Sequence, residues 1–199
     1  MAAPDHRLEL RLRDGLPVVA RPLRPEDRQA AAEAYRRLSP EARYHRFWTR
    51  GGSELGERML DRLLEVDPGN HEVWTVYDPA REFAPMGAAS WWRDREAPGE
   101  AEFSVTVLDS DQERGIGTLL LALMWLTALR NGIDRLVGHT LVENRRAVRW
   151  MRDTGAQGVW DGWKIVFRWE LTDLDRLPST PAAADLAAWL AELAPELLG

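Results

Sequence analysis

A glycine-bearing turn between a strand pattern and a long apolar helix pattern constrains this chain more than any other feature. Residues 105–118 read VTVLDSDQERGIGT, and a strongly apolar helical pattern follows as far as Arg130. Glycines such as Gly115 and Gly117 let the backbone approach a ligand closely and adopt φ values that other residues avoid. N–H groups at a helix N-terminus carry partial positive charge, which suits a phosphate or pyrophosphate. The segment therefore predicts a strand–loop–helix unit that can bind an anion through its backbone.

Two other phosphate-binding motifs fit the segment less well. A dinucleotide-binding fingerprint would have a third glycine where Leu120 stands, and its strand would open a parallel sheet. A P-loop would end in Gly-Lys-Ser or Gly-Lys-Thr, which the segment lacks. Taken alone, Gly-x-Gly is more often a plain helix start after a turn, so that alternative stays open at this point.

The rest of the chain alternates strand and helix patterns. An alternation of leucine with charged residues ahead of the turn Asp14-Gly15 predicts a β-hairpin over 7–22. Other strands are expected at 71–78, 86–94, 101–109 and 135–142, near Val159 and at 164–171, and helices at 25–38, 39–48, 53–66, 115–130 and 144–153. Turns with Pro or Gly separate the three strands before the glycine loop, which favours an antiparallel meander. The order as a whole indicates a mixed α/β fold.

Composition excludes several classes of function. The 199 residues suit one domain, and no apolar run reaches the ~18 residues that a membrane helix needs. The N-terminal stretch does not resemble a secretory signal, and the absence of cysteine excludes disulfides, thiolate metal sites and a cysteine nucleophile. A formal net charge of −6 gives no basic field for nucleic acid, and four histidines without ligand spacing give no sign of a metal site. We therefore expect a cytoplasmic protein that binds no nucleic acid, no membrane and no metal.

Two motifs in this framework resemble those of the GNAT superfamily of N-acetyltransferases. Gln112-x-x-Gly115-x-Gly117 is similar to the (Gln/Arg)-x-x-Gly-x-(Gly/Ala) loop with which that family binds acyl-CoA. Residues 144–155, NRRAVRWMRDTG, resemble the family's second motif, a helix headed by Asn and ended by Gly. The two motifs stand in the family's order and at its spacing, so together they are far more specific than Gly-x-Gly alone.

The beginning of the chain carries a third resemblance. LRPED at 23–27 and RLSPEARYHRFW at 37–48 are similar to the opening of bacterial members allied to protein lysine acetyltransferases. The resemblance covers roughly residues 16–171 and implies the GNAT fold, a mixed, mostly antiparallel sheet with helices on both faces. It implies a GNAT acetyltransferase domain over 1–172, followed by an Ala/Leu-rich tail at 173–199 with a short amphipathic helix.

The resemblance also assigns an acyl-CoA site residue by residue. The end of the strand would bond the pantetheine arm through its backbone, and the loop would wrap the pyrophosphate through its amides. The Asn that heads the second motif would lie near the pantetheine or thioester, and the two middle strands would splay apart to admit the thioester. These cofactor-binding residues are Val105, Thr106, Val107, Gln112, Glu113, Arg114, Gly115, Ile116, Gly117, Thr118 and Asn144.

Two residues are candidates for the base that an amine acceptor needs, since the acceptor must lose a proton before it attacks. Glu102 matches the position at which lysine-acetyltransferase-like members carry a base, with a strand-end surface charge as the alternative. His139 is the second candidate because its ordinary pKa lies near neutral pH, although a lone strand histidine is more often a core residue. Many family members carry a Tyr that protonates the leaving thiolate, where this chain has Met151. A thiol pKa of about 8.5 makes that loss tolerable.

Each of two groups of basic residues could either bind a ligand or form an ordinary solvated surface. Those of the second motif could reach the nucleotide phosphates or form a solvated face, and they are Arg145, Arg146 and Arg149. Those that precede the strands could meet an acidic acceptor or the CoA phosphates, and they are Arg36, Arg37, Arg43, His45, Arg46 and Arg50. For this second group, a solvated helical face with stems packed on Trp48 is the more common arrangement.

The resemblance implies direct transfer of an acetyl group from acetyl-CoA, as co-substrate, to the primary amine of a protein lysine or a small molecule. No covalent enzyme intermediate is expected, because the chain has no cysteine and no serine in a nucleophile setting. An acyl-CoA-binding sensor or interaction module without turnover is the alternative from another class, and a purely structural role is a third. The acceptor, the acyl length and whether the chain forms a homodimer stay open.

Overall fold

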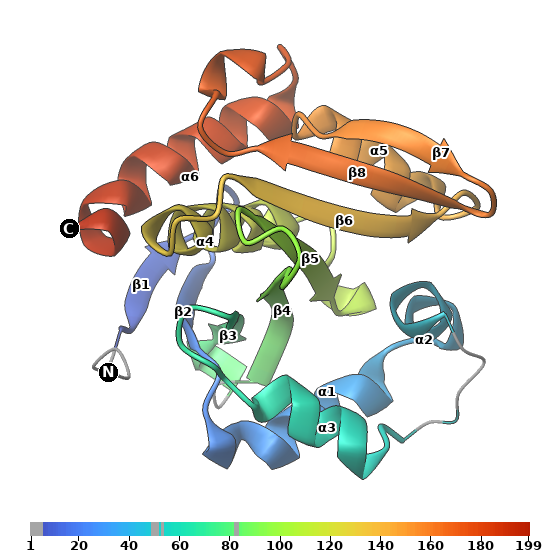
Figure 1. Ribbon diagram of the computed structural model, residues 1–199. Coiled ribbons are helices and arrows are strands. Elements are labelled where there is room, and N and C mark those ends of the chain that lie inside the picture. The colour runs from blue at the N-terminus through green and yellow to red at the C-terminus, as the bar shows by residue number, and fades with distance from the viewer. Residues whose placement is uncertain (1–5, 49–51, 53, 82–83) are drawn as a thin grey trace. The chain divides into compact units, whose positions relative to one another are not determined.

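A computed structural model describes residues 6–48, 52, 54–81 and 84–199 of the chain and shows a mixed α/β fold with one eight-stranded sheet (Figure 1). The strands are β1 (Leu8–Arg11), β2 (Pro17–Pro22), β3 (His71–Asp78), β4 (Ala84–Arg93), β5 (Glu100–Val107), β6 (Arg135–Leu141), β7 (Gln157–Asp161) and β8 (Lys164–Glu170). Their order in the sheet is β1-β2-β3-β4-β5-β6-β8-β7. The α-helices are α1 (Arg28–Arg37), α2 (Pro40–Phe47), α3 (Glu57–Leu64), α4 (Ile116–Arg130), α5 (Arg145–Asp153) and α6 (Pro181–Leu198).

The chain forms two compact units. Unit 1 comprises Met1–Ala89 and Val105–Leu120, and unit 2 comprises Ser90–Ser104 and Leu121–Gly199. Strands β4 and β5 and helix α4 each pass from one unit into the other. Among the described residues, no helix has both the length and the apolar character needed to cross a bilayer.

The predicted N-terminal hairpin is confirmed in unit 1. Strands β1 and β2 pair antiparallel with Leu8 opposite Ala20, and β2 continues antiparallel to β3 with Val19 opposite Tyr77. Gly15 in the connecting turn has φ of 83°, which costs a glycine nothing. Val19, Ala20, Val76 and Tyr77, which pair between β2 and β3, are at most 3% exposed, so the hairpin forms part of the core of unit 1.

Helices α1 to α3 follow the predicted order, but the helix expected from Pro25 starts with the 3-10 turn η1 (Pro25–Asp27), and α1 itself begins at Arg28. Ser39 caps α2, because its Oγ accepts a hydrogen bond of 3.1 Å from Ala42 N–H. Helix α3 was expected over 53–66 but spans only Glu57–Leu64. Gly56 occupies its N-cap with extended backbone, which places the first helical turn after the glycine; Ser53 lies outside the described residues.

The predicted antiparallel arrangement of β4 and β5 is visible in matched contacts. Ser90 and Ser104 share a hydrogen bond of 2.9 Å between their hydroxyls, and Leu108 N–H donates to Met86 O at 2.9 Å. From the first pair to the second, the residue number falls from 90 to 86 along β4 while it rises from 104 to 108 along β5 and the residue after it. Only antiparallel strands have this pattern.

The strand–loop–helix unit leads from β5 through α4 to β6, and β5 and β6 pair parallel in a sheet that is otherwise mostly antiparallel. They pair over four residues each, from Glu100 opposite Arg135 to Phe103 opposite Gly138. Among the described residues, β5 and β6 are not paired beyond Phe103 and Gly138. Helix α4, which connects them, is buried on almost every side, as its apolar sequence predicted.

Unit 2 is built on strands β6, β8 and β7, which pair antiparallel in that order. The Trp169 ring lies edge-on to Phe103 at 5.4 Å between centroids, and Trp169 Nε1–H donates to Thr154 Oγ1 at 3.3 Å. This cluster joins the sheet to α5. Gly155 ends α5 with φ of 94°, in agreement with the predicted glycine stop.

Helix α6 is longer than the short tail helix expected from the sequence. Thr180 caps it, since Thr180 Oγ1 accepts from Ala183 N–H at 3.1 Å and also donates to the backbone O of Asp153. One stripe of the helix is buried: Ala183, Leu186, Leu190, Leu193 and Leu197. The tail therefore packs within unit 2, and the division of the chain at residue 172 stays a prediction.

Candidate functional site

The backbone between β5 and α4 turns sharply at two residues. Glu113 has φ of 66° and Gly115 has φ of 86°, both in the left-handed region. Such a conformation is uncommon for a residue with a side chain, so its presence at Glu113 indicates that the surrounding structure holds the loop in this shape. A non-glycine residue held in the left-handed region, as Glu113 is, belongs to a class of strained residues that cluster at active sites and ligand-binding segments.

The amides that open α4 are placed for an anion. Gly115 O accepts the first hydrogen bonds of the helix, from Thr118 N–H at 3.1 Å and Leu119 N–H at 3.0 Å. The amides of Ile116 and Gly117 precede this ladder and have no intrahelical acceptor. They lie at the positive end of the helix dipole, so this end of α4 can bind a phosphate through backbone groups.

Gln112 closes the loop onto the strand before it. Its Nε2 donates to the backbone O of Val107 at 3.1 Å, across five positions of the chain. The side chain thereby ties the loop to the end of β5, whose last three residues are the predicted pantetheine contacts. This bond gives a physical reason for an amide side chain at the head of the motif.

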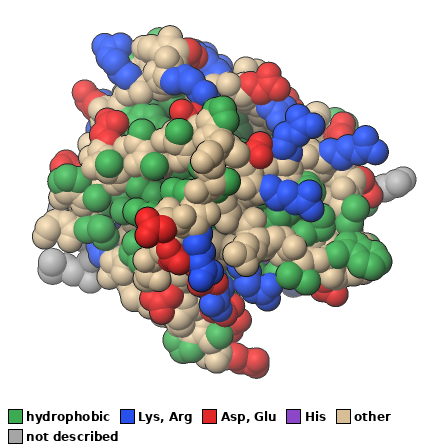
Figure 2. Space-filling view, turned by 90° about the horizontal axis from the view of Figure 1, so that it is seen from above, with side chains coloured by type: hydrophobic (Ala, Val, Ile, Leu, Met, Phe, Trp, Pro, Cys, Tyr) green, Lys and Arg blue, Asp and Glu red, His purple; other side chains and the backbone are tan. Residues whose placement is uncertain are grey.

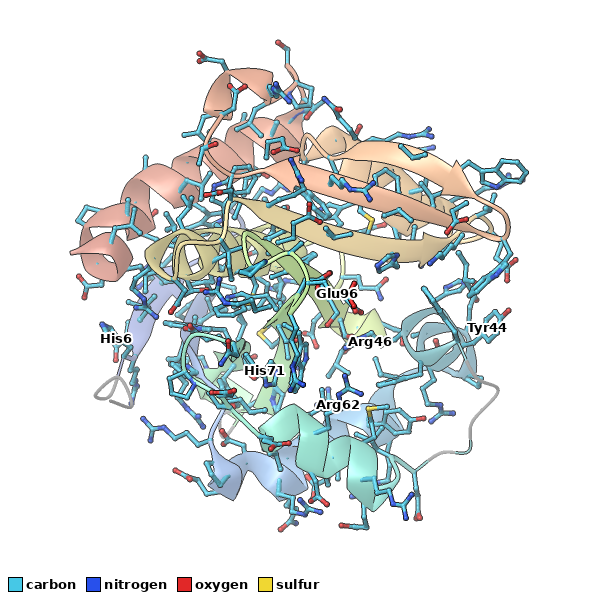
Figure 3. The ribbon with its side chains drawn as sticks, viewed as in Figure 1. His6, Tyr44, Arg46, Arg62, His71 and Glu96 are labelled. Carbon is cyan, nitrogen blue, oxygen red and sulfur yellow. The ribbon has the colours of Figure 1, made fainter. Side chains whose placement is uncertain are left out.

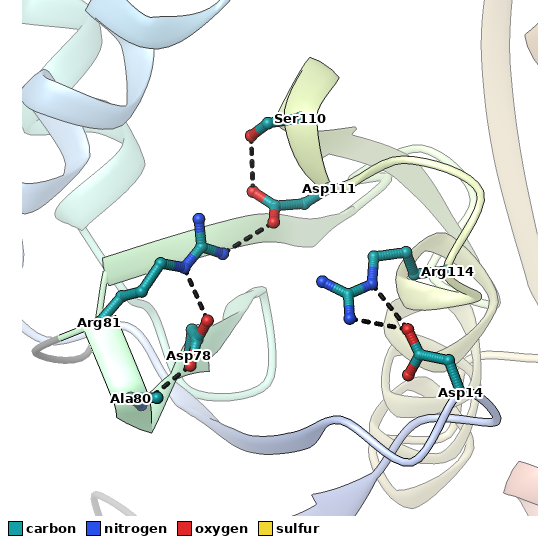
Figure 4. Close-up of polar contacts among 7 residues, drawn as sticks. All are labelled: Asp14, Asp78, Ala80, Arg81, Ser110, Asp111 and Arg114. Atoms are coloured by element: carbon teal, nitrogen blue, oxygen red, sulfur yellow. Dashed lines mark hydrogen bonds and ion pairs between the residues drawn. The ribbon is translucent and has the colours of Figure 1, made fainter.

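Arg114 is held by a residue that the sequence analysis treated only as part of a turn. Its Nε and one terminal nitrogen lie 2.8 Å and 2.7 Å from Asp14 Oδ2 (Figure 4). The Leu16 N–H and the Arg114 guanidinium lower the pKa of Asp14 below its ordinary value. The hairpin turn between β1 and β2 thus supports the loop from a hundred residues away in the sequence.

Two further contacts hold the 3-10 turn η3 (Asp109–Asp111), which immediately precedes Gln112. Asp109 accepts from Ser39 N–H at 2.9 Å and from Ser39 Oγ at 3.3 Å, which links the turn to the N-cap of α2. Asp111 accepts from Arg81 at 2.7 Å. Neither acid was predicted from the sequence, where their only signal is the polar run Asp-Ser-Asp between an apolar strand and the glycine motif.

The basic residues of α2 pack on aromatic rings. The Arg43 guanidinium lies 5.7 Å from the centroid of Tyr35, and that of Arg46 lies 5.0 Å from the centroid of Phe47. Figure 3 shows Tyr44 and Arg46 extending from α2. The contacts therefore join guanidinium groups to the rings of Tyr35 and Phe47, whereas the sequence predicted that the stems pack on Trp48; Arg50 lies outside the described residues.

Glu102 and His139 lie on one face of the sheet in unit 2. Glu102 stands opposite Val137 in the parallel pair, and His139 follows Val137 by two residues, so their side chains leave the sheet on the same side. Glu102 is exposed and His139 is half-buried. Burial lowers the pKa of His139, and the nearby Glu102 carboxylate opposes that shift. The sheet therefore brings the two candidate bases together, with a histidine that is neutral at neutral pH.

Asn144 is the N-cap of α5 in the structure. Its Oδ1 accepts from Ala147 N–H at 3.1 Å, which satisfies one of the first amides of the helix. Met151, on the same helix, is 6% exposed, and its Cε lies 3.4 Å from where a Cβ on Gly138 would be. Met151 is therefore a core residue that packs against the sheet.

Histidines and carboxylates stay dispersed. Within the described ranges, no three His, Asp or Glu side chains come together as metal ligands. His71 is fully buried in β3, with its Nδ1 2.6 Å from the backbone O of Glu65 (Figure 3). Basic and acidic side chains are interspersed on the face shown in Figure 2, so charges of one sign do not dominate it.

Comparison with known families decides the identity of the fold. A family model described as an acetyltransferase (GNAT) domain matches residues 18–157. The chain belongs to the GNAT acetyltransferase family. The predicted fold class is thereby confirmed.

Curated relatives of this GNAT chain are acetyltransferases. Acetyltransferase PA5475 of Pseudomonas aeruginosa is 31% identical over 143 residues, which cover 71% of the chain and 75% of the relative. Acetyltransferase Pat of Mycolicibacterium smegmatis is 27% identical over 180 residues, covering 89% of the chain and 53% of Pat. The chain thus spans about half the length of Pat.

Solved structures show the same fold. The GNAT domain of S. lividans PAT superimposes with a TM-score of 0.78 at 21% identity, covering 84% of this chain and 99% of that domain. The protein YncA of Salmonella typhimurium, solved with acetyl-CoA as its cofactor, gives a TM-score of 0.62 at 19% identity, covering 77% of this chain and 94% of that one. At these identities the likeness concerns the fold of this GNAT chain.

Proposed function

We propose that this GNAT chain is an N-acetyltransferase that moves an acetyl group from acetyl-CoA to a primary amine. The observation that carries the proposal is the loop before α4, which turns at Glu113 and Gly115 and leaves the Ile116 and Gly117 amides ahead of the helical ladder. An anionic pyrophosphate suits such a helix start. A solved neighbour with acetyl-CoA, YncA, supports this choice of co-substrate.

The proposed acyl-CoA contacts follow from that loop. The backbone of residues 105–107 would bond the pantetheine arm, and the backbone of residues 113–118 would surround the pyrophosphate. Gln112 would act by closing the loop, consistent with its bond to Val107 O. Asn144 would approach the pantetheine or thioester while its Oδ1 caps α5.

The proposed chemistry is direct attack of the amine nitrogen on the thioester carbonyl. Glu102 would accept the amine proton, directly or through a water molecule, and His139 is the second candidate because burial keeps its pKa low and its ring neutral. The tetrahedral intermediate would then expel the CoA thiolate. With the Tyr of many relatives replaced by buried Met151, the thiolate would leave without a side-chain acid, since a thiol pKa of about 8.5 makes it a fair leaving group.

The proposed acceptor is a protein lysine or a small-molecule amine, in a cytoplasmic setting, without metal, nucleic acid or membrane. Calorimetry should detect acetyl-CoA binding, and a thiol-release assay against lysine peptides and small amines should detect turnover. Binding followed by thiol release with one class of amine supports the proposal and identifies the acceptor. Binding without thiol release from any amine would instead favour an acyl-CoA sensor, and no binding at all would contradict both.

A further inference from the structure

Arg81 joins two parts of unit 1 that are thirty residues apart. It ends the 3-10 turn η2 (Pro79–Arg81) that follows β3. Its Nε donates to Asp78 Oδ2 at 2.6 Å, and one terminal nitrogen donates to Asp111 Oδ1 at 2.7 Å (Figure 4). One guanidinium therefore connects the end of β3 to the turn η3 that leads into the glycine loop.

Both carboxylates that Arg81 bridges are buried. The side chains of Asp78 and Asp111 are 7% and 3% exposed, whereas that of Arg81 is 38% exposed. The remaining oxygens also have donors: Ala80 N–H at 2.9 Å from Asp78 Oδ1, and Ser110 Oγ at 2.9 Å from Asp111 Oδ2. Burial by itself would raise the pKa of Asp78, but hydrogen bonds from Arg81 and Ala80 N–H hold it below its ordinary value. Removing Arg81 would leave two buried carboxylates without their cation.

The bridge controls the backbone that precedes the loop. Asp111 N–H donates to Leu108 O at 2.8 Å, which closes η3, and Gln112 follows at once with its own bond to Val107 O. Leu108 is held in turn by a buried cluster with Tyr35 and Leu38. The Asp111 side chain is therefore the point at which a charged group from η2, Arg81, contacts the turn that leads into the loop.

Arg81 is engaged differently from Arg114, the other cation in Figure 4. Arg114 belongs to the loop itself and pairs with Asp14, which is partly exposed. Arg81 lies outside the loop and directs its Nε and one terminal nitrogen at two buried acids. Its effect on a phosphate bound by the loop amides would pass through Asp111, which makes it a candidate for positioning rather than for contact.

We propose that Arg81 is a positioning residue for acyl-CoA binding: through buried Asp111 it holds η3 and the following loop in the conformation that presents the Ile116 and Gly117 amides. This proposal rests on the function proposed above. A loop that occupies the competent conformation for only about a tenth of the time binds about tenfold more weakly. Loss of Arg81 should therefore raise the Kd for acetyl-CoA and the KM for acetyl-CoA about tenfold, with little change in kcat.

The test compares Arg81→Met with Arg28→Met. Arg28 is a matched control, because it also bridges two carboxylates, those of Glu57 and Asp61, and its side chain is 39% exposed. Calorimetry gives the Kd for acetyl-CoA, the thiol-release assay separates KM from kcat, and hydrogen exchange reports on the amides of residues 112–119. We expect faster exchange there and a raised Kd in Arg81→Met alone. Arg81→Lys should recover part of the affinity, since it restores the charge without the two-pronged geometry.

A second variant, whose net charge equals that of the wild type, keeps the proposal testable if Arg81→Met does not fold. Arg81→Met combined with Asp111→Asn removes one charge of each sign, and Asp78 keeps its hydrogen bond from Ala80 N–H as the one carboxylate left of the bridge. That double variant should still show the raised Kd and faster exchange of residues 112–119. Wild-type affinity in a folded Arg81→Met or in the double variant would overturn the positioning role while leaving the proposed function intact. Failure of the wild-type chain to bind acetyl-CoA would overturn the proposed function, and this inference with it.

Discussion

Gly115→Ala isolates the contribution of the left-handed turn in the loop. Gly115 has φ of 86°, and a Cβ added there would lie 3.8 Å from Arg13 Nε, an ordinary van der Waals distance. The substitution therefore adds backbone strain without a steric clash. Left-handed backbone costs a residue with a side chain about 1–2 kcal/mol. For a chain of this size we expect a fall in Tm of roughly 2–8 °C.

The same strain predicts the effect on binding. If the loop of Gly115→Ala instead relaxes in the free protein, the Tm falls less, and acetyl-CoA must restore the strained turn when it binds. A cost of about 1–2 kcal/mol corresponds to a Kd raised roughly fivefold to thirtyfold. Gly115→Asn should lose less, because Asn tolerates the left-handed region better than Ala.

Gly132→Ala is the matched control for this experiment. Gly132 follows α4 with φ of 72°, and a Cβ there would have nothing within 4 Å. The Tm of Gly132→Ala should fall by a similar amount, and its Kd for acetyl-CoA should equal that of the wild type. Thermal unfolding with and without acetyl-CoA, together with calorimetry, measures both quantities. A Gly115→Ala protein that keeps a higher Tm than Gly132→Ala, because its turn has relaxed, and that still binds acetyl-CoA with wild-type Kd would show that the turn is not part of the acyl-CoA site.

Three other predictions concern the base, pH and the C-terminal helix. Glu102→Gln should lower kcat about a hundredfold to ten-thousandfold at neutral pH, with partial recovery at high pH and unchanged acetyl-CoA affinity. His139→Asn should lower kcat less. If thiol-release assays show the opposite ranking, His139 is the base. Because burial lowers the pKa of His139, the unfolded chain takes up its proton first as pH falls. The unfolding free energy should thus decline as pH drops from about 6.5 toward the folded pKa, and denaturant titrations of His139→Asn should show a flatter decline. Leu186→Ala removes a buried side chain and should lower the unfolding free energy by about 2–5 kcal/mol. The control Leu198→Ala, at an exposed position, should lower it by less than about 0.5 kcal/mol. Equal losses in denaturant titrations would mean that α6 does not pack as described.

Most of the elements and the glycine loop could be predicted from the sequence because their signals are local. Ser39 caps α2 through an amide three residues away, and Gly155 ends α5 with its own backbone conformation. The loop likewise depends on residues next to one another, from Gln112 to Gly117. Periodicity, caps and turn glycines act over a few positions, so they can be recognised before the chain is folded.

Element boundaries that depend on competition with the rest of the structure were less predictable. The helical pattern from residue 53 does not show that the helix starts only after Gly56. Nor does the pattern of the tail show that α6 extends from Pro181 to Leu198, because its length depends on how far Leu186 and its neighbours are buried. Burial is a property of the packed chain, and it overrides weak local preferences at helix ends.

The sequence by itself determined the order of the elements, the glycine loop and the family resemblance that carries the proposed chemistry. Only the tertiary structure decided what supports that loop: Asp14 reaches Arg114 across a hundred positions, and Arg81 reaches Asp111 across thirty. Nothing in the local sequence marks these partners, since an acid in a hairpin turn and an arginine after a strand are ordinary surface residues in isolation. Folding removes water from the Asp111 carboxylate and leaves the Arg81 guanidinium to satisfy it, whereas it brings the partly exposed Asp14 within reach of Arg114.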